Sequence, residues 1–434
     1  MSLTLIGIIG ILLLLFILFV FGIPVGFAMG LVGFSGFAYV MTYGASVNML
    51  ATVTWDTFSS YGLTVIPLFI FMGQIAFYSG VNEKLYNATF AWVGHIRGGL
   101  AMATVMACAA FSAICGSNAA TAATMTTVAL PQMTRYKYNP MLSTGAIACG
   151  STLGVVIPPS VVLIIYGLST EQSIAKLFYG GFGAGILLAF LLTLSVYVLC
   201  TIFPTWGPVG EKTSFRQKIK SLRGAVEMLI LFMVVMVGLF VGLFTPTEAG
   251  AVGSFAAVLL SMAQKSLSWK NFYNTIFDTM KVSCMVFVII AGAMVFGRFL
   301  AITRIPFDIA TWVGGLPFSK VTIMAIIFLI YALGGMIMDS LALLLITIPI
   351  FFPVAVKLGY DPIWFGVVIT VITTLGAVTP PVGATAYVVG GMAKNVPLEK
   401  VFQGVMYFLP AYVICIILMI LFPEIVLYLP GLLK

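Results

Sequence analysis

The nine residues STLGVVIPP, Ser151–Pro159, recur later in the chain as TTLGAVTPP, Thr373–Pro381, and this repeated stretch decides the fold. Each copy places a proline doublet inside an apolar run. A proline removes a backbone N–H donor and clashes with the preceding turn, which costs about 3 kcal/mol in a helix interior. The two copies therefore predict two helices that are interrupted at Pro158-Pro159 and at Pro380-Pro381.

Matching residues lie on both sides of these stretches at a nearly constant spacing, and we call its value from Thr152 to Thr374 the repeat offset. The repeat offset also relates Asn139-Pro140 to Asp361-Pro362, Pro131 to Pro353, and Pro24 to Pro246. Matches that keep the same order along both halves indicate an internal duplication. We therefore predict a first repeat over residues 1–210, a basic link over residues 211–223, and a second repeat over residues 224–434.

The composition predicts an all-α polytopic membrane protein that lies in a lipid bilayer. Of the 434 residues, 62% are apolar and only 7% are charged. A soluble domain usually carries about 25% charged residues, so too few are present to cover a water-facing surface. A helix needs about 20 mostly apolar residues to cross a bilayer, and counting such runs predicts about ten crossings.

Each repeat also contains a polar break within an apolar run. The first reads CGSNAAT over residues 115–121, and the second reads GGMIMDS over residues 334–340. Two half-length helices that meet at a polar tip fit these runs better than one straight span. Such a backbone persists at membrane depth only where protein or a water-filled cavity satisfies its polar groups. We expect re-entrant hairpins at about residues 98–133 and 320–356, beside broken helices over residues 140–167 and 361–391.

The basic residues indicate how the repeats are oriented. A net charge of +8 would suggest nucleic-acid binding in a soluble protein. Here the charges lie in short loops, where they set membrane orientation, so we expect no nucleic-acid partner. The basic link, which we place in the cytoplasm, contains Lys212, Arg216, Lys218, Lys220 and Arg223. Crossings counted outward from it make the two hairpins open from opposite sides, which is the inverted-topology repeat of many secondary transporters.

The breaks and tips together predict a cation site. Unwinding would free backbone carbonyls around residues 152–157 and 374–379. These carbonyls would face tips whose hydroxyl, amide and carboxylate oxygens suit a dehydrated cation such as sodium. A membrane carboxylate such as Asp339 is costly unless it is paired or functional. Taken singly, a polar tip can also be a packing notch and a proline doublet a simple kink.

Other polar residues give weaker indications. Glu248 begins a helix, where a carboxylate is favourable for structural reasons alone. Arg298 either extends toward the membrane surface or meets the substrate. His95 is the only histidine, so it can form neither a histidine metal cluster nor, with no serine nearby, a catalytic triad. No phosphate-binding Gly-Lys-Ser/Thr motif is present, so we expect neither an enzyme nor ATP hydrolysis.

Four motifs resemble those of a known family, the large membrane subunit of the tripartite ATP-independent periplasmic (TRAP) transporters of bacteria. They are ICGSN at 114–118, LGVVIPPS at 153–160, TPTEA at 245–249 and LGAVTPPVG at 375–383. The resemblance runs nearly end to end. It implies an elevator-type transporter in the bacterial inner membrane that imports an organic acid with sodium. The acid would be a C4-dicarboxylate, a sugar acid or sialic acid.

The resemblance also implies partners and site residues. The partners would be a periplasmic substrate-binding protein and a small four-helix membrane subunit, the latter as a separate chain. One sodium ion would bind at Gly116, Ser117 and Asn118 with carbonyls near Thr152 and Gly154. Another would bind at Asp339 and Ser340 with the region of Thr374, Gly376 and Thr379. The substrate carboxylate would lie between the tips, and the candidate residues for it are Ser117, Asn118, Ser340 and Arg298.

Two alternatives to this function remain open at the level of the sequence. The first is a self-sufficient sodium/carboxylate symporter with the same inverted architecture and no partner proteins. The second is a channel with re-entrant loops, which would carry uncoupled flux.

Overall fold

A computed structural model describes residues 2–210, 213–314 and 317–433, and within these ranges the chain is helical and forms no strand. Seven helical stretches are long and apolar enough to cross a membrane, and five further apolar helices have 10–17 residues. The predicted all-α membrane class is therefore confirmed. Lys212 of the basic link and the side chain of Arg223 lie outside the described residues.

The first half of the chain forms eleven α-helices and two short turns of other helix types. They are α1 (Leu3–Phe16), the π-helical η1 (Ile17–Phe21), α2 (Val25–Val40), α3 (Tyr43–Ser59), the 3-10 turn η2 (Tyr61–Thr64), α4 (Val65–Tyr78), α5 (Val81–Val93), α6 (Gly99–Cys115), α7 (Asn118–Arg135), α8 (Pro140–Ser151), α9 (Leu153–Val156), α10 (Val161–Thr170) and α11 (Ile174–Ile202).

The described residues of the second half form a matching series. They are α12 (Phe215–Phe240), α13 (Pro246–Ala263), α14 (Trp269–Ile302), α15 (Ile305–Gly314), α16 (Lys320–Gly335), α17 (Ser340–Lys357), α18 (Pro362–Gly376), α19 (Ala384–Met392), α20 (Leu398–Met406), α21 (Leu409–Leu421) and α22 (Glu424–Gly431). Much of the predicted link is thus helical, because Ser214 and Gln217 form a capping box that starts α12.

The repeat offset holds for the helices as well as for the sequence motifs. It carries both ends of α7 onto the ends of α17, and the first residue of α8 onto the first residue of α18. Helices α8 and α18 also begin with the same kind of side-chain cap. Asn139 Oδ1 accepts from the N–H of Met141 at 2.8 Å, and Asp361 Oδ1 accepts from the N–H of Ile363 at 2.8 Å. A capping side chain followed by proline is a strong helix start, so both repeats begin this helix at the same place.

The repeats pack against each other in reciprocal pairs. Helix α2 contacts α14, and its counterpart α13 contacts α4. Likewise α10 contacts α17, and α19 contacts α7. Glycine permits the closest of these approaches, since a Cβ atom on Gly292 would lie 2.0 Å from the carbonyl oxygen of Gly26. Small residues are the usual means of close helix packing in membranes. Each repeat therefore completes the other.

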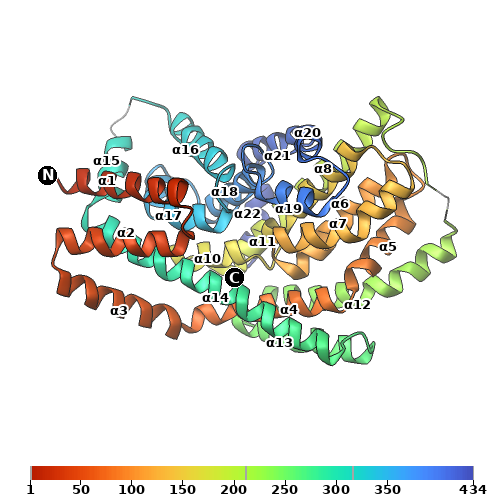
Figure 1. Ribbon diagram of the computed structural model, residues 1–434, viewed down its shortest axis with the longest axis horizontal. Helices are drawn as coiled ribbons and strands as arrows, with labels where there is room; N and C mark the ends of the chain where they lie inside the picture. The colour runs from red at the N-terminus through yellow and green to blue at the C-terminus, as the bar shows by residue number, and fades with distance from the viewer. Residues whose placement is uncertain (1, 211–212, 315–316, 434) are drawn as a thin grey trace.

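Figure 1 shows the result as two groups of helices. Helices α2, α3, α14, α13, α4 and α12 run along the lower part of the view. The two hairpins α6–α7 and α16–α17 and the helices that contact them lie above. Helix α5 contacts α6 and its counterpart α15 contacts α17, so these two helices join the groups.

Candidate cation site

The first hairpin tip is a two-residue break between α6 and α7. Gly116 has a φ of +62°, a left-handed conformation that glycine adopts without steric cost, and it ends α6. Ser117 is extended, and its side chain accepts from the N–H of Ala120 at 3.4 Å. Ser117 is therefore the N-cap of α7, and Asn118 is the first residue of that helix.

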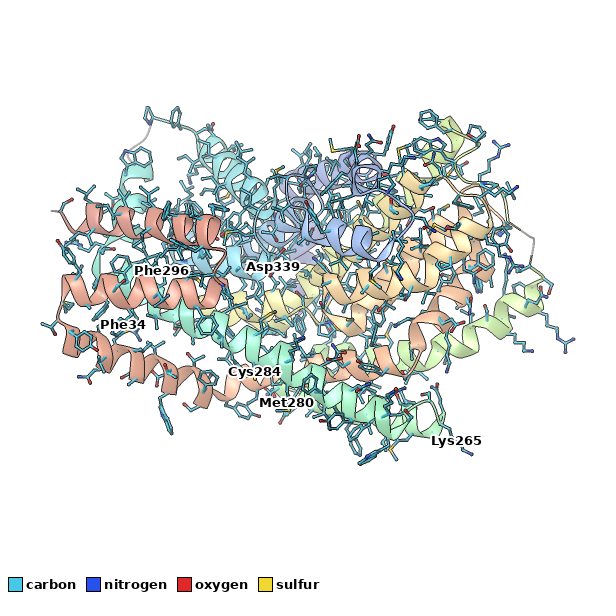
Figure 2. All side chains as sticks on the ribbon, in the orientation of Figure 1. Phe34, Lys265, Met280, Cys284, Phe296 and Asp339 are labelled. Carbon is cyan, nitrogen blue, oxygen red and sulfur yellow. The ribbon has the colours of Figure 1, made fainter. Side chains whose placement is uncertain are left out.

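The second tip uses the same device with a carboxylate. Asp339 is extended, and its Oδ2 accepts from the N–H of Leu341 at 3.1 Å, so it caps α17. Ser340 is the first residue of α17. Figure 2 places the exposed Asp339 near the middle of the molecule. Capping gives Asp339 a structural role that the sequence argument did not foresee.

The first proline doublet interrupts its helix later than expected. The sequence predicted unwinding around residues 152–157, but α9 is helical and the N–H of Ile157 still donates to the carbonyl of Leu153 at 2.8 Å. The reason is that proline removes donors only for the carbonyls four residues before it, which here belong to Gly154 and Val155. The Ser160 hydroxyl donates to Val155 instead. No described residue donates to the Gly154 carbonyl.

The second doublet leaves its carbonyls better satisfied. Pro380 and Pro381 remove the helical donors for Gly376 and Ala377, which end α18. The N–H and hydroxyl of Thr379 both donate to the Gly376 carbonyl at 3.0 Å, and the N–H of Thr385 donates to Ala377 at 3.0 Å. The two breaks therefore share a sequence pattern but differ in how they present oxygens.

Each hairpin tip lies directly on the break of its own repeat. A Cβ atom on Gly154 would come within 2.9 Å of the backbone of Ser117, and one on Gly376 within 2.4 Å of the backbone of Gly335. The Met336 carbonyl also accepts from the N–H groups of Val382 and Gly383 at 3.2 and 3.3 Å. The structure thus brings together each tip and each break that the sequence singled out.

Two buried oxygens at these tips have no hydrogen-bond partner. They are Oδ1 of Asn118 and Oγ of Ser340. Several other buried polar atoms of the described residues also lack a partner, but these two alone are related by the repeat offset. A buried polar group without a partner costs about 1–3 kcal/mol. The same cost thus recurs at equivalent positions of the two repeats.

The hydroxyl groups of the three threonines predicted to bind sodium donate to backbone carbonyls of their own segments. Thr152 Oγ1 lies 2.6 Å from the hydroxyl of Tyr412 and donates to the Cys149 carbonyl at 2.8 Å. Thr374 donates to Val371 at 2.7 Å. Thr379 donates to the last turn of α18. Their protons are used within their own segments, so they offer a cation only lone pairs and backbone carbonyls.

Sequence reasoning missed Tyr412, because it lies 260 residues beyond Thr152 and no motif marks it. Arg298 is exposed on α14, and no hydrogen bond or ion pair among the described residues joins it to either tip. Glu248 accepts from the N–H of Thr245 at 2.8 Å in the capping box of α13, which confirms its structural interpretation.

The chain is similar in sequence to a family of membrane transport proteins along nearly its whole length. Residues 12–425 match the family described as the tripartite ATP-independent periplasmic transporter, DctM component. The C4-dicarboxylate TRAP transporter large permease protein DctM of Pseudomonas aeruginosa is 33% identical over 402 residues, or 92% of this chain and 93% of that protein. The sialic acid TRAP transporter large permease protein SiaM of Vibrio cholerae is 31% identical, and 95% of each chain is covered.

Two further similarities bear on architecture. The isethionate TRAP transporter permease protein DctMQ of Oleidesulfovibrio alaskensis is 31% identical over 89% of this chain, which spans 60% of that longer protein. The YdaH transporter of Alcanivorax borkumensis, whose crystal structure shows an unusual topology, has a TM-score of 0.62 over 88% of this chain and 90% of its own. At 14% identity that likeness shows the fold alone.

These relatives are transporter proteins and not enzymes, as the sequence predicted. The family description makes the matched component one part of a tripartite system. A multi-pass membrane protein that has two matched hairpins and two broken helices, and that matches this family along nearly all its length, belongs to the DctM family of TRAP transporter large permeases.

Proposed function

We propose that this chain is the permease of a sodium-coupled importer of small organic acids. The relatives are named for C4-dicarboxylates, sialic acid, isethionate and ectoine. Each of these compounds carries a carboxylate or a sulfonate. An anionic headgroup is therefore the shared feature that the proposed substrate would have.

The observation that carries the sodium proposal is the matched pair of buried oxygens on Asn118 and Ser340. Amide, hydroxyl and carbonyl oxygens are the ligands that broken helices in transporters offer to sodium. In the first repeat the unpaired Gly154 carbonyl belongs to a residue that packs on the tip at Ser117. In the second, Asp339 adds a carboxylate beside Ser340. One ion at each tip would satisfy these groups.

The substrate would bind between the tips. Helices α7 and α17 begin there, and a helix N-terminus is positive and favours an anion. Ser117, Asn118 and Ser340 lie at these N-termini. Arg298 stays a candidate for the same anion, although no described residue at the tips contacts it here.

An elevator mechanism fits the packing. The second halves of the broken helices contact the hairpin of the opposite repeat, α19 on α7 and α10 on α17. The hairpins and broken helices would move as one body past the group formed by α2, α4, α13 and α14. Helices α5 and α15, which join the two groups, would bend during that motion.

We propose two partners, a periplasmic substrate-binding protein and a small four-helix membrane subunit, and a location in the bacterial inner membrane. The tripartite family description supports two further components. This chain spans 93% of the Pseudomonas DctM protein but only 60% of the DctMQ protein.

Thermal stability of the purified protein in sodium and in potassium, at equal ionic strength, tests the cation proposal. A ligand that binds only the folded state stabilises it by about 2.7 kcal/mol at one hundred times its Kd. We expect a sodium-specific rise that shrinks in Asn118→Ala and in Ser340→Ala. Equal stability in both salts would contradict sodium coupling, and proton coupling or a channel would then explain the family resemblance better.

Uptake into proteoliposomes tests the coupling and the partners. We expect accumulation of an organic acid under a sodium gradient only when the binding protein and the small subunit are present. Uptake by this chain alone would instead identify a self-sufficient symporter.

A further inference from the structure

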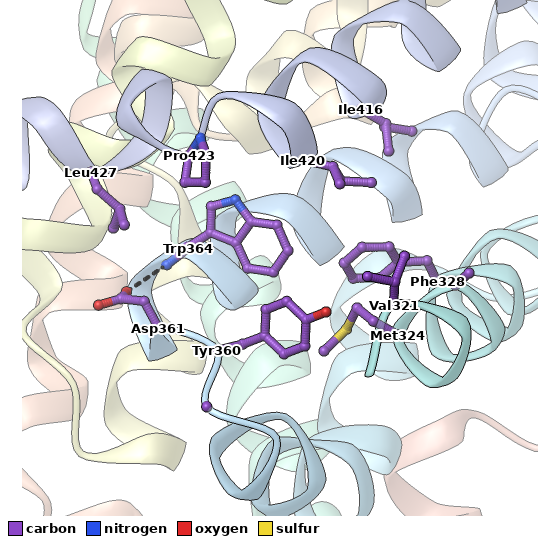
Figure 3. A pocket seen from close by; sticks show the side chains of 12 residues that line it. Val321, Met324, Phe328, Tyr360, Asp361, Trp364, Ile416, Ile420, Pro423 and Leu427 are labelled. Carbon is purple, nitrogen blue, oxygen red and sulfur yellow. Dashed lines mark hydrogen bonds between the residues drawn. The ribbon is translucent and has the colours of Figure 1, made fainter. Parts of the chain in front are cut away.

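A cavity of about 530 Å³ lies away from the tips, between α16, α18, α21 and α22. Figure 3 shows its wall, where the rings of Tyr360 and Trp364 lie close to Phe328 and Ile420. The rings of Tyr360 and Trp364 are stacked, with their centroids 5.3 Å apart. Tyr360 and Asp361 are lining residues with polar side-chain groups, and the Lys320 ammonium lies near Gly359 at the edge of this apolar space.

The equivalent place in the first repeat is filled by the chain itself. Tyr138 and Asn139 correspond to Tyr360 and Asp361 by the repeat offset. The Tyr138 hydroxyl donates to the carbonyl of Pro208 at 2.9 Å, and the Asn139 N–H donates to that of Trp206 at 2.9 Å. The segment over residues 203–210 thus supplies carbonyl acceptors and apolar side chains to these two donors.

In the second repeat the same donors are left free. Within the described residues neither the Tyr360 hydroxyl nor the Asp361 N–H forms a hydrogen bond. Figure 3 shows the Tyr360 hydroxyl directed toward the side chains of α16. After α21 the chain turns into α22, which packs on α11, so Pro423 and Leu427 line the cavity but no described residue beyond α21 accepts a hydrogen bond from these two donors. An occupant from outside the described chain that presents a hydrogen-bond acceptor would satisfy these donors.

The two repeats also differ in sequence at this place. In the first repeat α6 starts beside Gly98, where a Cβ atom would lie 2.5 Å from Cys200 Sγ on α11, so the two helices nearly touch. The residues that start α16, Lys320 and Val321, have larger side chains than Gly98 and Gly99 at the start of α6. The second repeat thus has larger residues at this helix start, and the cavity lies between α16 and α21.

Charge and location indicate the kind of occupant. The Lys320 ammonium lies 3.8 Å from the position of a Cβ atom on Gly359, which lines the cavity, so a cation stands at its rim. The cavity lies where α16 and α18 begin and α21 ends, at the ends of membrane helices. Tyr, Trp and Lys are typical of that interface. Beside it, Leu329 of α16 and Ile417 of α21 are exposed.

We propose that this cavity binds one phospholipid molecule. An acyl chain packs against Trp364 and Phe328, and an ester carbonyl accepts from the Tyr360 hydroxyl, as the Pro208 carbonyl does at Tyr138. The phosphate lies near Lys320. The bound lipid replaces in the second repeat the segment that covers the first, and it holds the start of the second hairpin against α18. The proposal is independent of sodium coupling.

Fluorescence quenching by a phospholipid with a brominated acyl chain tests it. Trp364 is only 4% exposed, so lipid at the outer surface does not reach its indole. The full chain is placed in vesicles of brominated or ordinary phosphatidylethanolamine, and its tryptophan fluorescence is measured. The contribution of Trp364 is the fluorescence of the wild type minus that of Trp364→Phe. We expect brominated lipid to abolish that difference.

Two matched variants keep every tryptophan in place. Ala325→Phe places a ring in the cavity and should restore the emission of Trp364 in brominated vesicles. Leu329→Phe adds a ring on the same helix outside the cavity and should not change quenching. Lys320→Gln should lower the amount of phospholipid that stays bound to the purified protein in native mass spectrometry, and Tyr360→Phe should do so too.

Unquenched Trp364 emission in brominated vesicles would overturn the proposal. The proposal would also fail if brominated lipid left the Trp364 emission unchanged and only addition of the other two transporter components altered it. A partner peptide would then be the occupant of the cavity. Equal quenching in Ala325→Phe and Leu329→Phe would likewise show that the lipid is not in the cavity.

Discussion

Replacing Gly376 by alanine should weaken sodium binding more than it weakens the fold. The added Cβ atom would lie 2.4 Å from the carbonyl carbon of Gly335 and 2.7 Å from the nitrogen of Met336. Ordinary van der Waals contact begins at 3.4 Å, so the second hairpin tip must withdraw by about 1 Å. Both neighbours are backbone atoms, which cannot turn aside as a flexible side chain can.

The size of the effect follows from that displacement. Overpacking of this kind typically costs about 1–3 kcal/mol. If the hairpin can withdraw when no cation is bound, the strain falls mainly on the bound state. A difference of about 1–3 kcal/mol between two states corresponds to about a 5- to 150-fold change in affinity. We therefore expect the Kd for sodium to rise by a factor in that range.

The assay is a sodium titration of thermal stability, with potassium added to keep the ionic strength constant. Gly391→Ala on α19 is the matched control, because nothing lies within 4 Å of its added Cβ atom. It should keep the wild-type response and gain about 0.5–1 kcal/mol from helix propensity. A Gly376→Ala protein that folds and keeps the wild-type Kd would refute the idea that tip and break form one cation site.

Three further predictions concern neighbouring groups. Asn118→Ala and Ser340→Ala should each gain about 1–3 kcal/mol in potassium by removing an unpaired buried oxygen, and each should lose part of the sodium response, as melting curves in the two salts would show. Gains without any loss of response would mean that these oxygens bind no ion. Asp339→Asn keeps a good N-cap, so its melting temperature in potassium should stay near wild type while the sodium Kd rises; an unchanged Kd would reduce Asp339 to a cap. Tyr412→Phe should cost about 0.5–1.5 kcal/mol by removing the hydrogen bonds of its hydroxyl to Thr152 and to the Cys149 carbonyl, without changing the sodium Kd, and a changed Kd would place that hydroxyl in the cation site.

The sequence predicted the architecture because its strongest signals are local and repeated. A proline removes its own N–H wherever it stands, so Pro158 and Pro380 predict breaks without any tertiary information. The repeat offset then transfers each observation from one repeat to the other. The same reasoning found the tips, because a polar run in a membrane segment must have its backbone satisfied somewhere.

The sequence was less accurate about which oxygens are free. It predicted unwinding from Thr152, but helical hydrogen bonds continue to Ile157. It treated Asp339 as a carboxylate that must be paired or functional, and the structure shows it capping α17. Local hydrogen bonds depend on backbone geometry, and residues that differ between the repeats, such as Thr379, alter that geometry without a visible motif.

The sequence by itself determined the membrane class, the duplication, the two tips and the two breaks, since these follow from composition, period and proline chemistry. Only the tertiary structure decided that Gly154 and Gly376 set the distance between tip and break. It alone showed that Tyr412 engages Thr152, and that one repeat fills a cavity which the other leaves open. These features depend on contacts between residues far apart in the chain, and a contact of that kind has no period or spacing by which a sequence could reveal it.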